Sequence, residues 1–247
     1  MSITKGEIEV LAQEVVSLAA SGKNTAALNV LKPILDVKCP FTKLDMLGRK
    51  IGQAGRDNMK LFETFDTVIG YDAMGGYVIV GQALIQFLPR NFTRVMEKSR
   101  EYIIKGNAWY VCDIIGERSL GYAVVDYFDE TLSWLETFLN DESNWVKRSA
   151  GVAVHFFSKR VRDQPEKTKM LLRIIEPHIE EKEINVVKGI GWGLKTIGRY
   201  HPDILVEFLK NQLKLEKNIS RIMMRKALTY LGKDKKAEIK RVISHRM

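Results

Sequence analysis

The sequence predicts an all-α fold in which paired helices stack to form a solenoid. Apolar residues recur with helical periodicity nearly from end to end, and strand signals are scarce. From about residue 107 onward, the helical segments form units of similar length, which is typical of a helical-repeat protein. The chain has 247 residues, 45% of them apolar and 28% charged, so it can bury a sizeable core without disulfides. We expect a single α-helical solenoid domain over residues 1–247, with the clearest repeats in 107–247.

Capping residues and glycines mark the ends of the expected helices. Short polar side chains that can accept a backbone N–H open three segments, at Asn58, Ser143 and Asp203. Glycines close three others, at Gly22, Gly106 and Gly232. The expected helices are, in chain order, 4–20, 24–36, 41–54, 58–70, 73–88, 91–105, 107–126, 130–139, 143–160, 165–179, 183–200, 203–214, 218–231 and 234–245.

An internal repeat becomes visible when four segments are aligned. They begin at Asp113 (DIIGERSLG), Arg148 (RSAGVAVHF), Lys188 (KGIGWGLKT) and Arg225 (RKALTYLGK), at offsets of 35, 40 and 37 residues. The fourth position of the first three segments is a glycine, Gly116, Gly151 and Gly191. A small residue there lets neighbouring helices approach closely, which is typical of HEAT-type repeats.

The first positions of these segments predict the chemistry of the inner surface. In a HEAT-like solenoid they would lie in a line along the inner helices, so Arg148, Lys188 and Arg225 predict a concave basic cleft. Such a surface can follow a phosphate backbone by charge neutralisation. Asp113 at the first position would repel the same ligand, so it needs a function. The alternative is an ordinary salt bridge between Asp113 and Arg148.

The basic excess of the chain lies at its C-terminal end. Residues 210–247 carry twelve Lys and Arg against three Asp and Glu, whereas the first 209 residues carry 27 of each. Within this region Lys226 follows Arg225, and further basic residues recur at helical spacing. A basic end indicates a polyanionic partner, with nucleic acid first among the candidates. A solvated pair of C-terminal helices is the alternative.

Several classes of site and location are disfavoured. Cys39 and Cys112 do not have the spacing of a metal-binding motif, and we expect no disulfide between them. The four histidines do not have the spacing of metal ligands either, so we expect no metal site. The longest uncharged run, residues 73–89, is too short and too rich in glycine to span a membrane. With no signal-peptide pattern at the start, we expect a cytoplasmic protein.

Three tryptophan-containing stretches carry a resemblance to a known family. AWYVCD contains Trp109 and Asp113, NWVKRSA contains Arg148, and VKGIGWGLKTIGRYHPD contains Trp192. Together they resemble the motifs of the AlkD-like DNA alkylation-repair glycosylases, which are HEAT-like solenoids, over about residues 100–231. The resemblance implies that Asp113 is the catalytic carboxylate, that Trp109 and Trp192 flank the lesion nucleotide, and that Arg148 holds the DNA backbone.

The resemblance also implies a reaction. Such enzymes hydrolyse the N-glycosidic bond of N3- or N7-alkylated purines in duplex DNA, with no cofactor and no metal. We expect a monofunctional enzyme, acting as a monomer, with Lys188, Arg225 and Lys226 holding further phosphates. One position departs from the pattern, because the family often carries an acidic residue directly after the first tryptophan and this chain has Tyr110 there.

Two other functions stay open on the sequence alone. One is a DNA-binding solenoid without activity, selecting branched or distorted duplexes, and the other is a protein-interaction HEAT scaffold. A tryptophan in a helical repeat is more often a core residue, and Trp134 is interpreted as structural. Trp145 is interpreted as structural or as part of the rim of the cleft. A nucleophilic Cys112 with His155 as its base is disfavoured, because nothing in the sequence lowers the thiol pKa.

Overall fold

The computed structural model describes residues 3–244, and among these residues it contains helices and no strand, as predicted. By contacts the chain divides into two compact units, Met1–Ser119 and Leu120–Met247. The expected helix over 234–245 is found as α15 (Lys233–Ser244), and its last expected residue, His245, lies outside the described residues.

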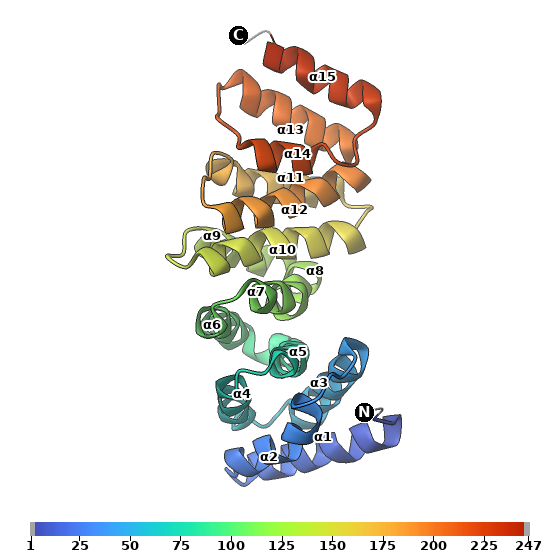
Figure 1. Cartoon of the computed structure of the whole chain (residues 1–247), viewed down its shortest axis with the longest axis vertical. Coiled ribbons are helices and arrows are strands. Elements are labelled where there is room, and N and C mark those ends of the chain that lie inside the picture. The colour runs from blue at the N-terminus through green and yellow to red at the C-terminus, as the bar shows by residue number, and fades with distance from the viewer. Residues whose placement is uncertain (1–2, 245–247) are drawn as a thin grey trace. The chain divides into compact units, whose positions relative to one another are not determined.

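The first unit stacks its helices in two rows (Figure 1). In the first row α1 packs on α3, α3 on α5 and α5 on α7, and α2 in the second row packs on α1 and α4. An edge-to-face cluster of Phe62, Phe65 and Phe87, with ring centroids 5.0–6.0 Å apart, lies in its core. The helices are α1 (Lys5–Ala20), α2 (Asn24–Leu35), α3 (Phe41–Gly55), α4 (Leu61–Gly70), α5 (Met74–Leu84), α6 (Leu88–Gly106) and α7 (Trp109–Ile115).

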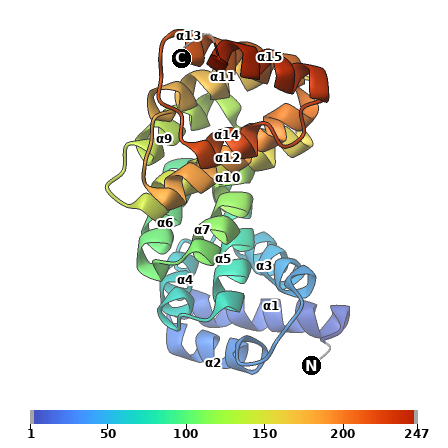
Figure 2. The same ribbon diagram turned by 45° about the horizontal axis from the view of Figure 1, so that its top comes forward.

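The second unit shows the predicted paired-helix repeat most plainly (Figure 2). One layer is formed by α8, α10, α12 and α14, and the other by α9, α11, α13 and α15, with each helix packed on the next in its own layer. The helices are α8 (Gly121–Asp126), α9 (Phe128–Leu139), α10 (Asn144–Arg160), α11 (Pro165–Ile175), α12 (Ile184–Tyr200), α13 (Pro202–Lys214) and α14 (Arg221–Ala227).

The predicted close approach of helices at a glycine is confirmed for Gly151. A Cβ atom placed on Gly151 of α10 would lie 2.3 Å from the backbone carbon of Gly189 on α12. The backbones of α10 and α12 are therefore in direct contact, because neither helix carries a side chain at this crossing. This contact fixes how the two helices present the rest of their side chains.

Several helix ends differ from the expectation. The single helix expected over 107–126 is interrupted by a π-helical turn, Gly116–Leu120, which is bordered by glycines that allow the backbone to widen. The helix α14 is shorter than the expected 218–231, because the Ser220 side chain caps it by accepting from the Met223 N–H. Ser143 is the N-terminal flanking residue of α10, as expected, but α13 begins at Pro202 and α4 begins three residues after Asn58.

Candidate functional site

A tight turn sets the start of α7 and the position of its first residue. The helix α6 ends at Gly106, and Asn107 then adopts a left-handed conformation with φ of 41°. A side chain on Gly106 could not be accommodated, because its Cβ would lie 2.7 Å from Val111 Cγ2 and 2.8 Å from the Tyr77 hydroxyl. The turn therefore brings the chain directly into α7 with Trp109 at its first position.

Trp109 is an exposed aromatic residue and is not part of the core. It is 60% exposed, and its ring contacts the edge of Tyr110, with centroids 6.1 Å apart and planes at 89°. A tryptophan usually buries most of its surface, so an exposed one on an ordered helix indicates a contact surface for a ligand. A tryptophan in a helical repeat is more often a buried core residue, but that interpretation is wrong for Trp109.

Asp113 lies one turn after Trp109 on the same helix face, as the four-residue spacing predicts. It is half-buried and is the only charged residue of α7. Its neighbour Cys112 is fully buried, which argues further against a nucleophilic role for that thiol. The exposed edge of α7 thus carries one aromatic ring and one carboxylate.

An ion pair between the buried Arg118 and the half-buried Asp45 holds the segment that follows Asp113. Arg118, in the π-helical turn, is 9% exposed, and its Nε donates to Asp45 Oδ1 of α3 at 2.8 Å. Its Nη1 also donates to the Ile114 carbonyl oxygen at 3.2 Å. Removing one partner of such a pair leaves a buried charge uncompensated, so Arg118 and Asp45 fix the C-terminal end of α7 against α3.

Trp192 on α12 has a partner that the sequence did not indicate. Its half-buried indole stacks on the imidazole of His155 from α10, with ring centroids 4.2 Å apart and planes at 23°. Thr196 links the two residues, because its hydroxyl lies 2.6 Å from His155 Nδ1 and donates to the Trp192 carbonyl oxygen at 3.1 Å. One hydroxyl has one proton, so Thr196 accepts from Nδ1–H of the neutral imidazole.

The surroundings of His155 keep its imidazole uncharged at neutral pH. Burial, and after it the nearby positive charges of Lys159, Arg160 and Lys195, together lower its pKa to about 4. The sequence shows that Trp192 and Thr196 are one helical turn apart. It does not show how α10 is rotated about its axis, and this rotation is what places His155 against the indole.

The helices α10, α12 and α14 carry basic residues as their only charged residues. None of the three contains an Asp or a Glu, and together they carry ten Lys and Arg residues. The neighbouring α9 of the other layer has the opposite character, with Asp129, Glu130 and Glu136 and no basic residue. We call the surface formed by the basic residues of α10, α12 and α14 the basic face.

The four basic residues expected at the site lie together on this face. Burial lowers the pKa of Lys226, and the positive charges of Lys195, Arg148, Lys188 and Arg225 lower it further. These cations come from three successive helices, as the repeat alignment predicted. Lys195 was not among the predicted residues. The sequence does contain a signal for it, because helical spacing puts four residues on one side of α12, namely Lys188, Trp192, Lys195 and Arg199.

The basic residues differ in how they are held. Arg148 is only 8% exposed, and its Nη1 donates to the Asn185 carbonyl oxygen at 3.5 Å. Lys188 and Arg225 are exposed, and Lys226 is half-buried. Two of the four predicted side chains can therefore reach an external phosphate directly, whereas Arg148 is part of the packed layer beneath them.

Alternating cations and tyrosines extend the basic face along α12. Tyr230 lies between Lys195 and Arg199, whose charged groups are 5.1 and 5.2 Å from its ring centroid. Tyr200 in turn lies 5.5 Å from Arg199 and 4.3 Å from the guanidinium of Arg162. Each cation packs on a ring, which holds long side chains in place and reduces the entropy lost when they bind a ligand.

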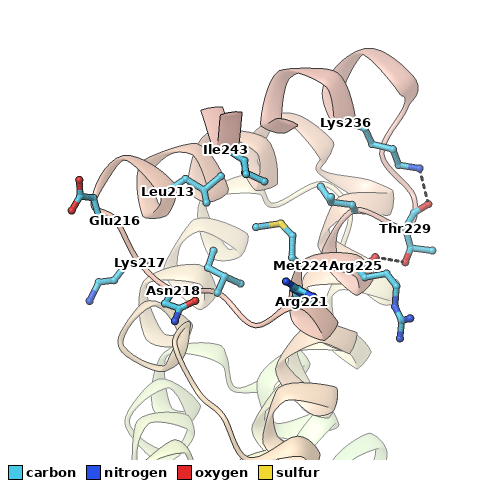
Figure 3. A pocket seen from close by; sticks show the side chains of 12 residues that line it. Leu213, Glu216, Lys217, Asn218, Arg221, Met224, Arg225, Thr229, Lys236 and Ile243 are labelled. Atoms are coloured by element: carbon cyan, nitrogen blue, oxygen red, sulfur yellow. Dashed lines mark hydrogen bonds between the residues drawn. The ribbon is translucent and has the colours of Figure 1, made fainter. Parts of the chain in front are cut away.

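A hollow of the second unit lies beside this face (Figure 3). It measures about 970 Å³ and is bordered by α13, α14 and α15. Leu213, Met224 and Ile243 line its interior, and Arg225 at its rim is the one residue that it shares with the predicted site. Trp192 and Lys188 do not border it, so this hollow is not the predicted site.

The described residues offer neither a metal site nor a membrane-spanning helix. Within residues 3–244 no cluster of three or more His, Cys, Asp and Glu side chains is arranged to hold a metal ion. The same stretch includes no helix with the length and apolarity that a membrane span needs.

The family comparison matches most of the chain. The model of the family described as DNA alkylation repair enzyme matches residues 50–231 of the 247. The chain belongs to the DNA alkylation repair enzyme family. This membership confirms the predicted family and the predicted class of function, enzymatic repair of alkylated DNA. All the predicted site residues of this DNA alkylation repair enzyme, from Trp109 to Lys226, lie within the matched range.

A solved structure supports the fold of this family member. The chain is similar to the Pseudomonas fluorescens alkylpurine DNA glycosylase AlkC bound to DNA containing an abasic site analog, with a TM-score of 0.61 and 15% identity. The match covers 96% of this chain and 67% of that one. No curated protein matches this DNA alkylation repair enzyme. At 15% identity the similarity confirms the helical-repeat fold.

Proposed function

We propose that this chain is a monofunctional DNA glycosylase that hydrolyses the N-glycosidic bond of N3- or N7-alkylated purines in duplex DNA. The observation that carries the proposal is the pair on α7, in which a 60% exposed Trp109 stands one turn before Asp113. In a member of the DNA alkylation repair enzyme family, an exposed ring beside a carboxylate fits a reaction in which positive charge develops on a sugar.

The basic face supports the binding of duplex DNA. Lys188, Arg225 and Lys226 lie on helices with no acidic residue, so their field is not cancelled locally. Neutralising phosphates with such cations releases condensed counterions, which gives sequence-independent affinity that falls with salt. Lys195 and Arg199 extend the same row along α12 and are proposed as further backbone contacts, with Arg148 supporting the row from below.

The chemistry follows from the charge of the substrate. An N3- or N7-alkylated purine already carries a positive charge, so it leaves as a neutral base when the bond to C1′ breaks. Positive charge then builds up on the deoxyribose, and the Asp113 carboxylate stabilises it and orients the attacking water. The water oxygen bonds to C1′, its proton is released, and an abasic site remains in the DNA. The face of Trp109 favours the same positive charge through its ring quadrupole, and Trp192 is proposed as the second tryptophan that contacts the lesion nucleotide.

The test is base release from a duplex oligonucleotide that carries one 7-methylguanine, read as strand cleavage after alkali. Wild type and Asp113→Asn are compared in single-turnover conditions, with Asp129→Asn on the exposed start of α9 as the matched control. We expect Asp113→Asn to bind the duplex as wild type does and to excise the base at least about a hundredfold more slowly, the scale of losing one well-placed electrostatic stabiliser. Equal rates for wild type and Asp113→Asn would overturn the assignment of Asp113.

A second function is favoured by one observation, the tyrosine at position 110. Its ring packs against Trp109 where the family often has an acidic residue, so Asp113 lacks that neighbour. If the wild-type protein releases no base but binds the duplex tightly, the chain is a DNA-binding member without glycosylase activity. Trp109 and Asp113 would then contact DNA without catalysing hydrolysis.

A further inference from the structure

His155 is a titratable residue that contacts a predicted site residue, Trp192, and has no role in the reaction described above. It comes from α10 and stacks on Trp192 of α12 with centroids 4.2 Å apart, so it covers one face of the indole. Trp192 is half-buried, so part of its side chain remains open to a ligand.

We propose that His155 is the positioning residue for Trp192, fixing the plane of the indole so that its opposite face meets the deoxyribose of the alkylated nucleotide. The inference rests on the proposed function of Trp192. Its physical basis is a closed set of contacts. The imidazole stacks on the indole and is hydrogen-bonded to the Thr196 hydroxyl, and this hydroxyl is hydrogen-bonded to the carbonyl oxygen of Trp192. A ring held at its face and through its own backbone loses little freedom on binding.

The charge state of His155 is part of this role. Burial together with the positive charges of Lys159 and Arg160 from α10 and Lys195 from α12 keeps the imidazole neutral. A protonated imidazole would place a positive charge on one face of the indole while the substrate brings another to the opposite face. Repulsion between these two charges on opposite faces of one ring would slow the reaction on the order of tenfold or more.

The structure suggests two variants that separate these contributions. His155→Phe keeps a flat ring under the indole but can neither accept a proton nor bond to Thr196. His155→Ala removes the ring altogether and leaves Trp192 without its partner. Because both variants lose the hydrogen bond to Thr196, a difference between them reports on the stack.

The experiment measures excision and tryptophan fluorescence on the full chain. We expect His155→Ala to excise 7-methylguanine at least about tenfold more slowly in single turnover, with a duplex Kd within about twofold of wild type, and His155→Phe to recover most of the rate. The helical circular dichroism of each variant is recorded beside these rates. Wild-type excision by His155→Ala, or equal loss in both variants, would overturn the proposal.

Fluorescence provides a readout that does not depend on activity. A protonated imidazole quenches a stacked indole, so we expect wild-type emission to fall as the pH is lowered from 6 toward 4, over the range in which the helical signal is constant. The change should be absent in His155→Phe and in Trp192→Phe. If the wild type releases no base, the proposed function fails. In that case fluorescence still tests the stack. Equal Trp192 emission in His155→Ala and in wild type would show that the two rings do not stack.

Discussion

Lys226 reaches the basic face by passing over Gly191. A Cβ atom on Gly191 would lie 2.8 Å from Lys226 Cδ and 3.2 Å from Lys226 Cβ. The repeat alignment interpreted this glycine as a helix-packing position, and Gly151 has that function. Gly191 is also a packing position, because its Cβ would lie 3.5 Å from the Met223 Cα of α14. It makes room on α12 for the Lys226 stem as well, so the same repeat position contributes to packing in both repeats and to the basic face in the second.

Gly191→Ala should therefore weaken DNA binding without weakening the fold. The new methyl group would displace the flexible Lys226 side chain, while alanine favours the helix interior by up to about 1 kcal/mol. We expect a severalfold loss of affinity for a duplex at about 0.1 M salt and a melting temperature equal to or above that of wild type. Fluorescence anisotropy and thermal unfolding measure the two effects. Gly6→Ala on α1, where a Cβ would meet nothing within 4 Å, is the control. Unchanged affinity together with a lower melting temperature would contradict this account of Gly191.

Gly151→Ala should have the opposite pattern, a loss of stability. Its Cβ would lie 2.3–2.5 Å from the backbone atoms of Gly189 and Ile190, which cannot rotate away as a side chain can. The helices α10 and α12 would have to separate, and overpacking of this kind costs about 1–3 kcal/mol or more. Urea unfolding at pH 7.5 measures the change in unfolding free energy, again beside Gly6→Ala. A wild-type midpoint would show that the crossing has more room than the structure indicates.

Charge removal on the basic face should change the salt dependence of DNA binding. Lys188→Gln and Arg225→Gln each remove one exposed cation, and each should reduce the slope of log Kobs against log salt by about 1 if the residue contacts a phosphate. Lys169→Gln on α11 is the matched control, because it removes the same charge from a side chain that pairs with Glu166 at 2.8 Å in the other layer. If the control lowers the slope as much as the two variants, the effect comes from net charge and not from the face.

The buried histidine should make stability depend on pH below neutrality. The pKa of His155 is about 4 in the folded chain and about 6.5 when unfolded, so the unfolded state binds more protons between these values. The stability contributed by neutral His155 is therefore complete above about pH 6.5 and is lost as the pH falls toward 4. Burial also lowers the pKa values of His178 and His201, which act in the same direction.

His155→Phe isolates the contribution of this residue. Urea unfolding of wild type and variant at pH 7.5, 6 and 5 should show a shallower decline in the variant, with a difference on the order of 1 kcal/mol between the ends of the range after allowance for solvent screening. Parallel declines in the two proteins would mean that His155 is protonated as readily in the folded chain as in the unfolded one.

The sequence by itself determined the helices and the spacing of residues along them. The expected segments 24–36, 143–160 and 183–200 agree with α2, α10 and α12 to within a residue at each end, because helical periodicity and capping are local properties. Helical spacing alone predicted that Trp109 and Asp113 share one face of α7. The repeat alignment predicted the row of Arg148, Lys188 and Arg225, since a repeat places equivalent positions on neighbouring helices.

Only the tertiary structure decided which side chains meet across helices. Trp192 stacks on His155, Arg118 pairs with Asp45, and Arg148 is buried while Lys188 is exposed. None of these follows from periodicity, because a small rotation of one helix about its axis changes the partner of every side chain on it without changing its pattern. That rotation is fixed by close packing of the whole layer, including the backbone contact at Gly151, and so depends on residues far apart in the chain.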